Sequence, residues 1–148
     1  MFRALTISAF LGAVTMVPAF SAEPASTTAA TDAISNEFLS DLQAGKTTEA
    51  WQFAFKNFPN MAGDQGLTRA ATQTESYTKS LGNISKWTKL KTVDVTDTLC
   101  REVFYVELEK APLFFEFLFF KHENSWSVIN INMDTYATAK TKGFFDDK

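Results

Sequence analysis

The chain has 148 residues, of which 45% are hydrophobic and 14% are aromatic. This composition is enough for one packed globular domain, and it excludes the disordered, collagen-like and disulfide-scaffold classes. Fourteen lysines and arginines against seventeen aspartates and glutamates give a formal net charge of −3, and the sequence pI is near 5.1. A surface that binds the phosphates of nucleic acid needs the opposite balance, so no nucleic-acid partner is predicted.

The first 21 residues have the three parts of a secretory signal peptide. Arg3 supplies the positive charge, residues 4–17 form an uncharged and largely apolar run, and small residues precede a cleavage site after Ser21. Cleavage there predicts an exported protein, periplasmic or secreted, with no stable membrane span after processing. The alternative is that the apolar run is retained as a membrane anchor.

Residues 22–31 are small and polar without periodicity, which predicts a flexible linker before a domain at 32–136. A tail follows at 137–148, and its two adjacent phenylalanines either pack on the sheet or face a partner. Cys100 is the only cysteine, so no internal disulfide can form and we expect a buried thiol. Stability must therefore come from packing.

Three helices are predicted in the first half of the domain, because apolar residues recur there every three or four positions. The first begins at Asp32, which can cap it, and is stopped by Gly45. The second lies between Thr47 and Pro59. The third runs over residues 67–81 and is followed by another glycine.

After the third helix the apolar period changes from about 3.6 to 2, as expected where helices give way to strands. Four strands are predicted, at 86–96, 101–109, 113–121 and 125–134. Short turns that are polar or contain proline join them as hairpins. The predicted fold class is therefore α+β, with three N-terminal helices packed on a curved four-stranded antiparallel sheet.

The third predicted strand, LFFEFLFF at 113–120, is apolar on both sides, which is typical of a central strand covered on both faces. With Lys121 paired to Trp126, the face away from the helices carries an apolar set from the last two strands. This set is Phe114, Leu118, Phe120, Ile129, Ile131 and Met133. A patch of this kind predicts a homodimer that buries it face to face. In the alternative the helices cover this face, and the side of Phe115 and Phe117 is the outer one.

Several short motifs accompany this order of elements. The segment LQAGK at 42–46 ends the first helix, Ala50 and Trp51 lie in the second, and the last hairpin reads FFKHENSWSV at 119–128. Over residues 34–134 the chain resembles the nuclear transport factor 2-like superfamily, especially its small exported members of unknown function. The resemblance implies a cone of curved sheet around helices, a pocket at its open end and dimers through the outer sheet face. Members include isomerases, dehydratases, binding modules and assembly domains, so the fold alone does not select a function.

An enzyme of this family would need a pocket Asp, Glu or His as proton carrier, often with a Tyr. Glu116 is the best candidate, because a strand of Phe and Leu can desolvate its carboxylate and raise its pKa. If Leu108 pairs with Leu113, Tyr105 lies directly across from Glu116. Alternatively, Glu116 faces water or an interface ion pair and keeps the strand soluble. The only histidine, His122, falls in a predicted turn and is interpreted as solvated surface.

A binding site is predicted from Asn130 and Asn132, which alternate with apolar residues and would face the side of Trp126 and Val128. The alternative is that both amides lie at the rim of the sheet and meet only water. One histidine and one cysteine provide no metal-ligand set, and no catalytic triad or phosphate loop is present, so no metal or cofactor is predicted. The sequence favours an exported, non-enzymatic interaction or ligand-binding domain, with a small-molecule or protein partner. An isomerase or dehydratase that uses Glu116 as acid and base is the alternative.

Overall fold

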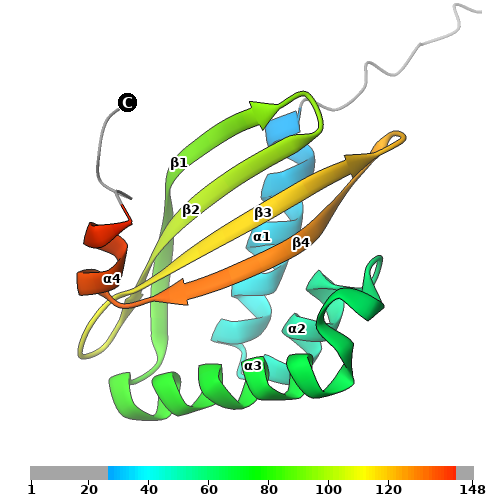
Figure 1. Cartoon of the computed structure of the whole chain (residues 1–148). Coiled ribbons are helices and arrows are strands. Elements are labelled where there is room, and N and C mark those ends of the chain that lie inside the picture. Colours follow the sequence, from blue (N-terminus) through cyan, green and yellow to red (C-terminus); the bar gives the residue numbers. More distant parts are fainter. Residues whose placement is uncertain (1–26, 143–148) are drawn as a thin grey trace, which may run out of the picture.

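The computed structural model describes residues 27–142. Its elements are α1 (Thr27–Gln43), α2 (Thr47–Ala54), α3 (Pro59–Leu81), β1 (Ile84–Thr96), β2 (Leu99–Leu108), β3 (Leu113–His122), β4 (Ser125–Asp134) and α4 (Tyr136–Thr141). The predicted fold class is confirmed, since three helices precede a four-stranded antiparallel sheet and pack on it (Figure 1). The predicted signal peptide and the two tail phenylalanines lie outside the described residues. Between residues 27 and 142, no helix combines the length and the apolar character that a bilayer span requires.

Helix α1 begins five residues before the predicted start at Asp32, so it includes the end of the segment predicted as a linker. Tertiary contacts explain the extension. Ala30 packs against the core, and the fully buried Thr31 donates a hydrogen bond from Oγ1 to Glu102 Oε1 of β2 at 2.7 Å. Contacts with the sheet therefore hold a stretch whose local sequence gives no helical periodicity.

The glycines that follow α1 and α3 have the roles that the sequence predicts. Gly45 has a φ of +77° and Gly82 a φ of +93°, a backbone region that favours glycine. At Gly82 a side chain would also collide with Glu109, the residue that follows β2, because a Cβ there would lie 2.7 Å from the Glu109 Cβ. Helix α3 is longer than predicted and begins at Pro59, a residue well suited to the first turn of a helix.

The four strands are arranged in the order β1-β2-β3-β4, and α1 crosses one face of this sheet (Figure 1). The predicted pair Lys121 and Trp126 is present in the β3–β4 hairpin. The predicted pair Leu108 and Leu113 is wrong by two residues, because Val106 is the partner of Leu113. The end of β2 runs past β3 and pairs with the start of β1 instead, so the β2–β3 turn is longer than predicted.

A β-bulge in β4 changes which side chains face the helices. Leu118 pairs with Asn130 and Phe119 with Val128, so Ile129 has no partner on β3. One extra residue reverses the alternation of side chains beyond it. The expected grouping of β4 is therefore wrong after Val128: Ile131 lies opposite Phe117 and packs in the core under the helices.

The core lies between the three helices and the inner face of the sheet and is mainly aromatic. Phe115, Phe117 and Phe119 form a row on β3 with centroid separations of 6.4 and 6.0 Å. Phe38 of α1 meets this row edge-on, with its centroid 5.4 Å from that of Phe117. Edge-to-face and offset contacts of this kind add to the stabilisation from burial. Phe38, Leu39 and Leu42 of the predicted apolar face of α1 are all buried here.

The outer face of the sheet is partly covered by α4, in the segment predicted as a tail. Ala139 of α4 packs with Val103 and Phe114, and Phe114 is only 2% exposed. The six residues of the predicted dimer patch are thus divided. Ile131 and Met133 face the helices, Phe114 lies under α4, Ile129 is the half-buried residue of the bulge, and Leu118 and Phe120 remain half-buried on the outer face. The predicted central position of β3, covered on both faces, agrees with this arrangement.

Candidate functional site

A cavity of about 410 Å³ lies between α3 and the bulged part of β4. Apolar residues from the α2 region, α3 and β4 line its wall: Trp51, Phe55, Leu67, Ala70, Ile129, Ile131 and Met133. Small-molecule sites in proteins are typically about 300–1,000 Å³ and mostly apolar, with a few polar groups. The cavity therefore has the size that a small organic ligand requires, and it offers apolar and polar surface in about equal shares.

The aromatic part of the wall is fixed before any ligand arrives. The indole Nε1 of Trp51 donates a hydrogen bond to Thr74 Oγ1 of α3 at 3.1 Å. The Trp51 ring meets Phe38 edge-on at 5.3 Å between centroids and stacks on Phe55 at 6.2 Å. A ring held by a hydrogen bond and two aromatic neighbours loses little further freedom when a ligand binds, which favours affinity.

The polar groups of the cavity are amides. Gln73 of α3 and the predicted pair Asn130 and Asn132 of β4 all line it. The bulge at Ile129 turns the side chains of the two asparagines away from the face of Trp126 and Val128, which they were expected to share. They lie opposite Leu118 and Glu116 on the outer face, and both residues border the cavity from the edge strand. No charged side chain is among the cavity's described lining residues. An ion would lose its hydration here without gaining a charged partner, so the lining suits an uncharged ligand.

The residues of the predicted acid–base pair lie on the outer face, away from this cavity. Glu116 pairs with Val103 rather than with Tyr105, and its Oε1 lies 3.7 Å from an Arg101 terminal nitrogen. Tyr105 instead pairs with Phe114, with ring centroids 5.7 Å apart. His122 ends β3 and is exposed. The two-residue difference in the hairpin register explains why Glu116 and Tyr105 do not face each other.

A second carboxylate, which the sequence interpretation did not single out, is far more buried. Glu102 of β2 has no exposed surface and faces α1. Thr31 Oγ1 donates to its Oε1 at 2.7 Å, and Ser35 Oγ donates to its Oε2 at 2.6 Å. Lys89 Nζ lies 3.9 Å from Glu102 Oε1 and forms a closer ion pair with Asp32. The signal was present in the sequence, since Glu102 is the only charged residue in an otherwise apolar inner row of β2.

Burial controls the protonation chemistry of this cluster. Loss of solvation raises the pKa of Glu102, the hydroxyls of Ser35 and Thr31 lower it, and the nearby Asp32 carboxylate raises it again, for a net increase. The neighbouring Cys100 is also fully buried, and burial together with the charges of Glu102 and Asp94 raises the pKa of its thiol to about 12. A thiol with this pKa stays protonated and unreactive at neutral pH. Both side chains are fully buried, and the hydrogen bonds from Thr31 and Ser35 to Glu102 join α1 to the sheet.

Searches against family models, curated proteins and solved structures all fail to find a match for this chain. In the described range there is also no group of three or more His, Cys, Asp or Glu side chains placed to hold a metal ion.

Proposed function

We propose that this chain is an exported, non-enzymatic binding domain for a small uncharged molecule with an apolar body and hydrogen-bonding groups. The apolar body would lie against Trp51 and the neighbouring aromatic wall, and its polar groups would meet the side chain of Gln73 and the main-chain groups of Asn130 and Asn132 on the edge strand. The single observation that carries the proposal is the cavity of about 410 Å³ with a preformed aromatic wall and no charged lining residue among those described.

Membership of the nuclear transport factor 2-like superfamily is part of this proposal. Three helices on one face of an antiparallel sheet, with a cavity between helix and sheet, support it.

Export is proposed from the signal-peptide pattern of the first 21 residues. Mass spectrometry of the protein from its native host is expected to give an N-terminus at Ala22 or Glu23, and an intact Met1 in the cytosol would contradict export. Self-association is proposed through Leu118 and Phe120, the apolar part of the outer face that α4 does not bury.

The alternative function, an isomerase or dehydratase that uses Glu116, is less well supported by the same geometry. An acid–base catalyst must lie within hydrogen-bond reach of a bound substrate. Glu116 lies on the outer face beside Arg101, whereas the cavity lies on the helix side. Glu102 has the environment of a perturbed carboxylate but no exposed surface.

The binding proposal is tested with Nile red, an uncharged dye whose fluorescence rises in apolar sites. We expect the exported protein to bind it and Ala70→Phe to weaken binding at least tenfold, because Ala70 lines the cavity and a phenyl group would occupy it. Ser76→Phe is the matched control: it adds the same group to an exposed position of α3 outside this cavity. Circular dichroism spectra should show that both variants are folded.

Two outcomes would contradict the proposal. The first is unchanged Nile red binding in Ala70→Phe, which would place the dye elsewhere. The second is an equal loss in Ser76→Phe, which would show a general effect of a new surface phenylalanine.

A further inference from the structure

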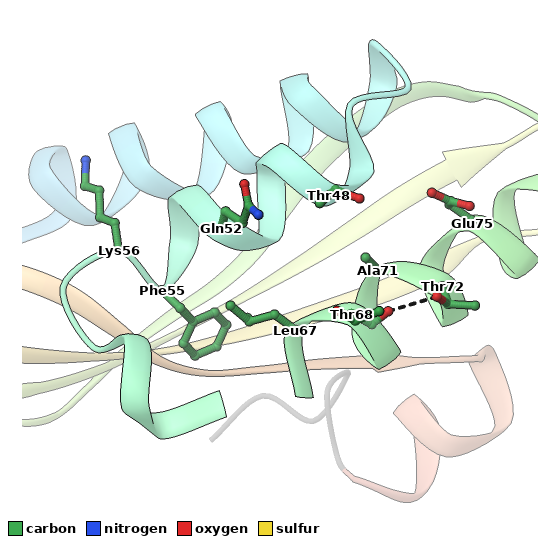
Figure 2. A pocket seen from close by; sticks show the side chains of 9 residues that line it. All are labelled: Thr48, Gln52, Phe55, Lys56, Leu67, Thr68, Ala71, Thr72 and Glu75. Atoms are coloured by element: carbon green, nitrogen blue, oxygen red, sulfur yellow. Dashed lines mark hydrogen bonds between the residues drawn. The ribbon is translucent and has the colours of Figure 1, made fainter. Parts of the chain in front are cut away.

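A second concave site lies in the groove between α2 and α3, with a volume of about 390 Å³ (Figure 2). Its apolar floor contains Phe55 and Leu67, which also border the cavity beside β4, so the two sites are neighbours. Unlike that cavity, the groove carries ionisable and hydroxyl-bearing side chains on both walls. It therefore requires a ligand of different chemistry.

Helical periodicity explains why polar side chains face the groove from both sides. Thr48 and Gln52 are four residues apart on α2, and Thr68 and Thr72 are four residues apart on α3, so each pair lies on one side of its helix. Thr72 Oγ1 donates a hydrogen bond to the Thr68 carbonyl oxygen at 2.9 Å, and this bond fixes the position of the Thr72 side chain on the wall. The groove thus presents hydroxyl and amide groups along its length above an apolar floor.

The two ends of the groove carry opposite charges. Figure 2 shows Lys56 and Glu75 at opposite ends of the row of lining side chains. The ammonium of Lys56 lies 4.3 Å from the centroid of the Phe53 ring, and Glu75 Oε2 lies 3.7 Å from Lys79 Nζ at the surface. Exposed contacts of this kind are weak and are readily exchanged for a ligand. A dipolar ligand can therefore satisfy both ends at once.

We propose that this groove binds a short extended peptide with free termini, independently of the ligand proposed for the cavity beside β4. Its carboxylate would meet Lys56, its amino group would meet Glu75, and its side chains would pack on Phe55 and Leu67. The length is appropriate for about three residues. From Thr68 to Glu75 the helix rises about 10 Å, which an extended tripeptide covers at about 3.3–3.6 Å per residue.

The peptide chemistry explains more of the lining than a single amino acid does. In a free amino acid the ammonium and the carboxylate are attached to the same carbon, so the two charged groups cannot reach both ends of the groove. The backbone of a tripeptide spans the distance and offers N–H and C=O groups to Gln52 and the threonine hydroxyls of the walls. An uncharged ligand would leave Lys56 and Glu75 without a role.

The test uses trileucine in three forms: with free termini, with an acetylated N-terminus and with an amidated C-terminus. Binding to the exported protein is measured by calorimetry and by amide shifts in ¹⁵N-labelled protein. We expect each cap to raise the dissociation constant about two- to fivefold, the usual effect of one exposed ion pair. Lys56→Gln should abolish the preference for acid over amide, and Glu75→Gln should abolish the preference for amine over acetyl. The matched controls Lys46→Gln and Glu49→Gln remove exposed charges outside the groove and should preserve both preferences.

Equal binding of the free and capped peptides would overturn the proposal, as would preferences that persist in Lys56→Gln and Glu75→Gln. Absence of binding by every form would also overturn it. If trileucine shifts the amides of Asn130 and Asn132 and not those of the groove, the peptide proposal fails and the cavity proposal is unaffected. Nile red binding is likewise independent, because Ala70 does not line the groove.

Discussion

Replacing Glu102 by glutamine should remove a specific pH dependence of stability. The carboxylate is fully buried and its pKa is raised above the ordinary value of 4.5. A raised pKa means that the folded state holds the proton more tightly than the unfolded state does. Its contribution to stability is therefore complete below pH 4.5 and is lost as the pH rises through the folded-state pKa. Above the folded-state pKa, the unfolding free energy of wild type is lower by about 1.4 kcal/mol for each unit by which that pKa exceeds 4.5, relative to a protein with a non-titrating residue at this position.

Glutamine keeps the shape and can still form hydrogen bonds with the hydroxyls of Thr31 and Ser35. Urea unfolding from pH 4 to 8, followed by tryptophan fluorescence, should show the free energy of unfolding of Glu102→Gln gaining on wild type as the pH rises. Asp32, Lys89, Asp94 and Cys100 are present in both proteins, so the difference isolates Glu102. The control Glu107→Gln alters a carboxylate on the same strand that is exposed and paired with Lys86 at 3.2 Å, and should cost less than about 1 kcal/mol.

A raised pKa of Glu102 is contradicted if the unfolding free energy of wild type rises relative to that of Glu102→Gln as the pH increases. That result would mean that the hydroxyls and Lys89 outweigh burial and lower the pKa of Glu102 in the folded protein. Parallel pH profiles of the two proteins would refute it as well, since they would show that the pKa is the same in the folded and unfolded states.

Three further predictions concern other parts of the fold. Ile131→Lys should lower the unfolding free energy, measured in urea, by about 3–5 kcal/mol, because it buries an unpaired charge under the helices. Leu118→Lys on the outer face should instead preserve the fold and dissociate any dimer, as measured by sedimentation equilibrium. If both variants stay folded, the face assignment of β4 is wrong. Cys100 should resist iodoacetamide at pH 8 in the native protein and react fully in urea, as measured by mass spectrometry, because its pKa is about 12 and its side chain is buried; rapid native labelling would contradict this. Gly82→Ala should lower the unfolding free energy by about 1–3 kcal/mol and more than Gly45→Ala, because only the first adds a steric collision to the positive φ; equal losses would argue against that collision.

Local patterns in the sequence were sufficient for most of the architecture. The apolar period of α1 correctly placed Phe38, Leu39 and Leu42 in the core, and the fully apolar third strand indicated a sheet covered on both sides. These features depend on residues close in sequence, so they can be deduced without knowing the partners. The positions of the hairpin turns followed for the same reason, although the β2–β3 register did not.

The candidate site required information that local patterns do not contain. The extra residue at Ile129 leaves no mark on composition, yet it decides whether Asn130 or Ile131 faces the helices. The importance of Glu102 depends on Thr31, 71 positions away in the chain. Glu116 and Glu102 both lie among apolar residues of the sheet, and only the packing of α1 shows which of them is fully buried.

The bulge in β4 also separates two kinds of change in this strand. If Ile129 were to pair with Leu118, the residues after it would shift by one place, and Asn130 and Asn132 would point at the phenyl rings of the core. Two amides without hydrogen-bond partners would then replace two apolar side chains, at a cost of several kcal/mol. Deleting Ile129 would not cause that exchange, because the residues after it would keep their present partners on β3. Homologues with this sheet should therefore tolerate loss or substitution of the bulged residue while conserving the pairing of the residues that follow it.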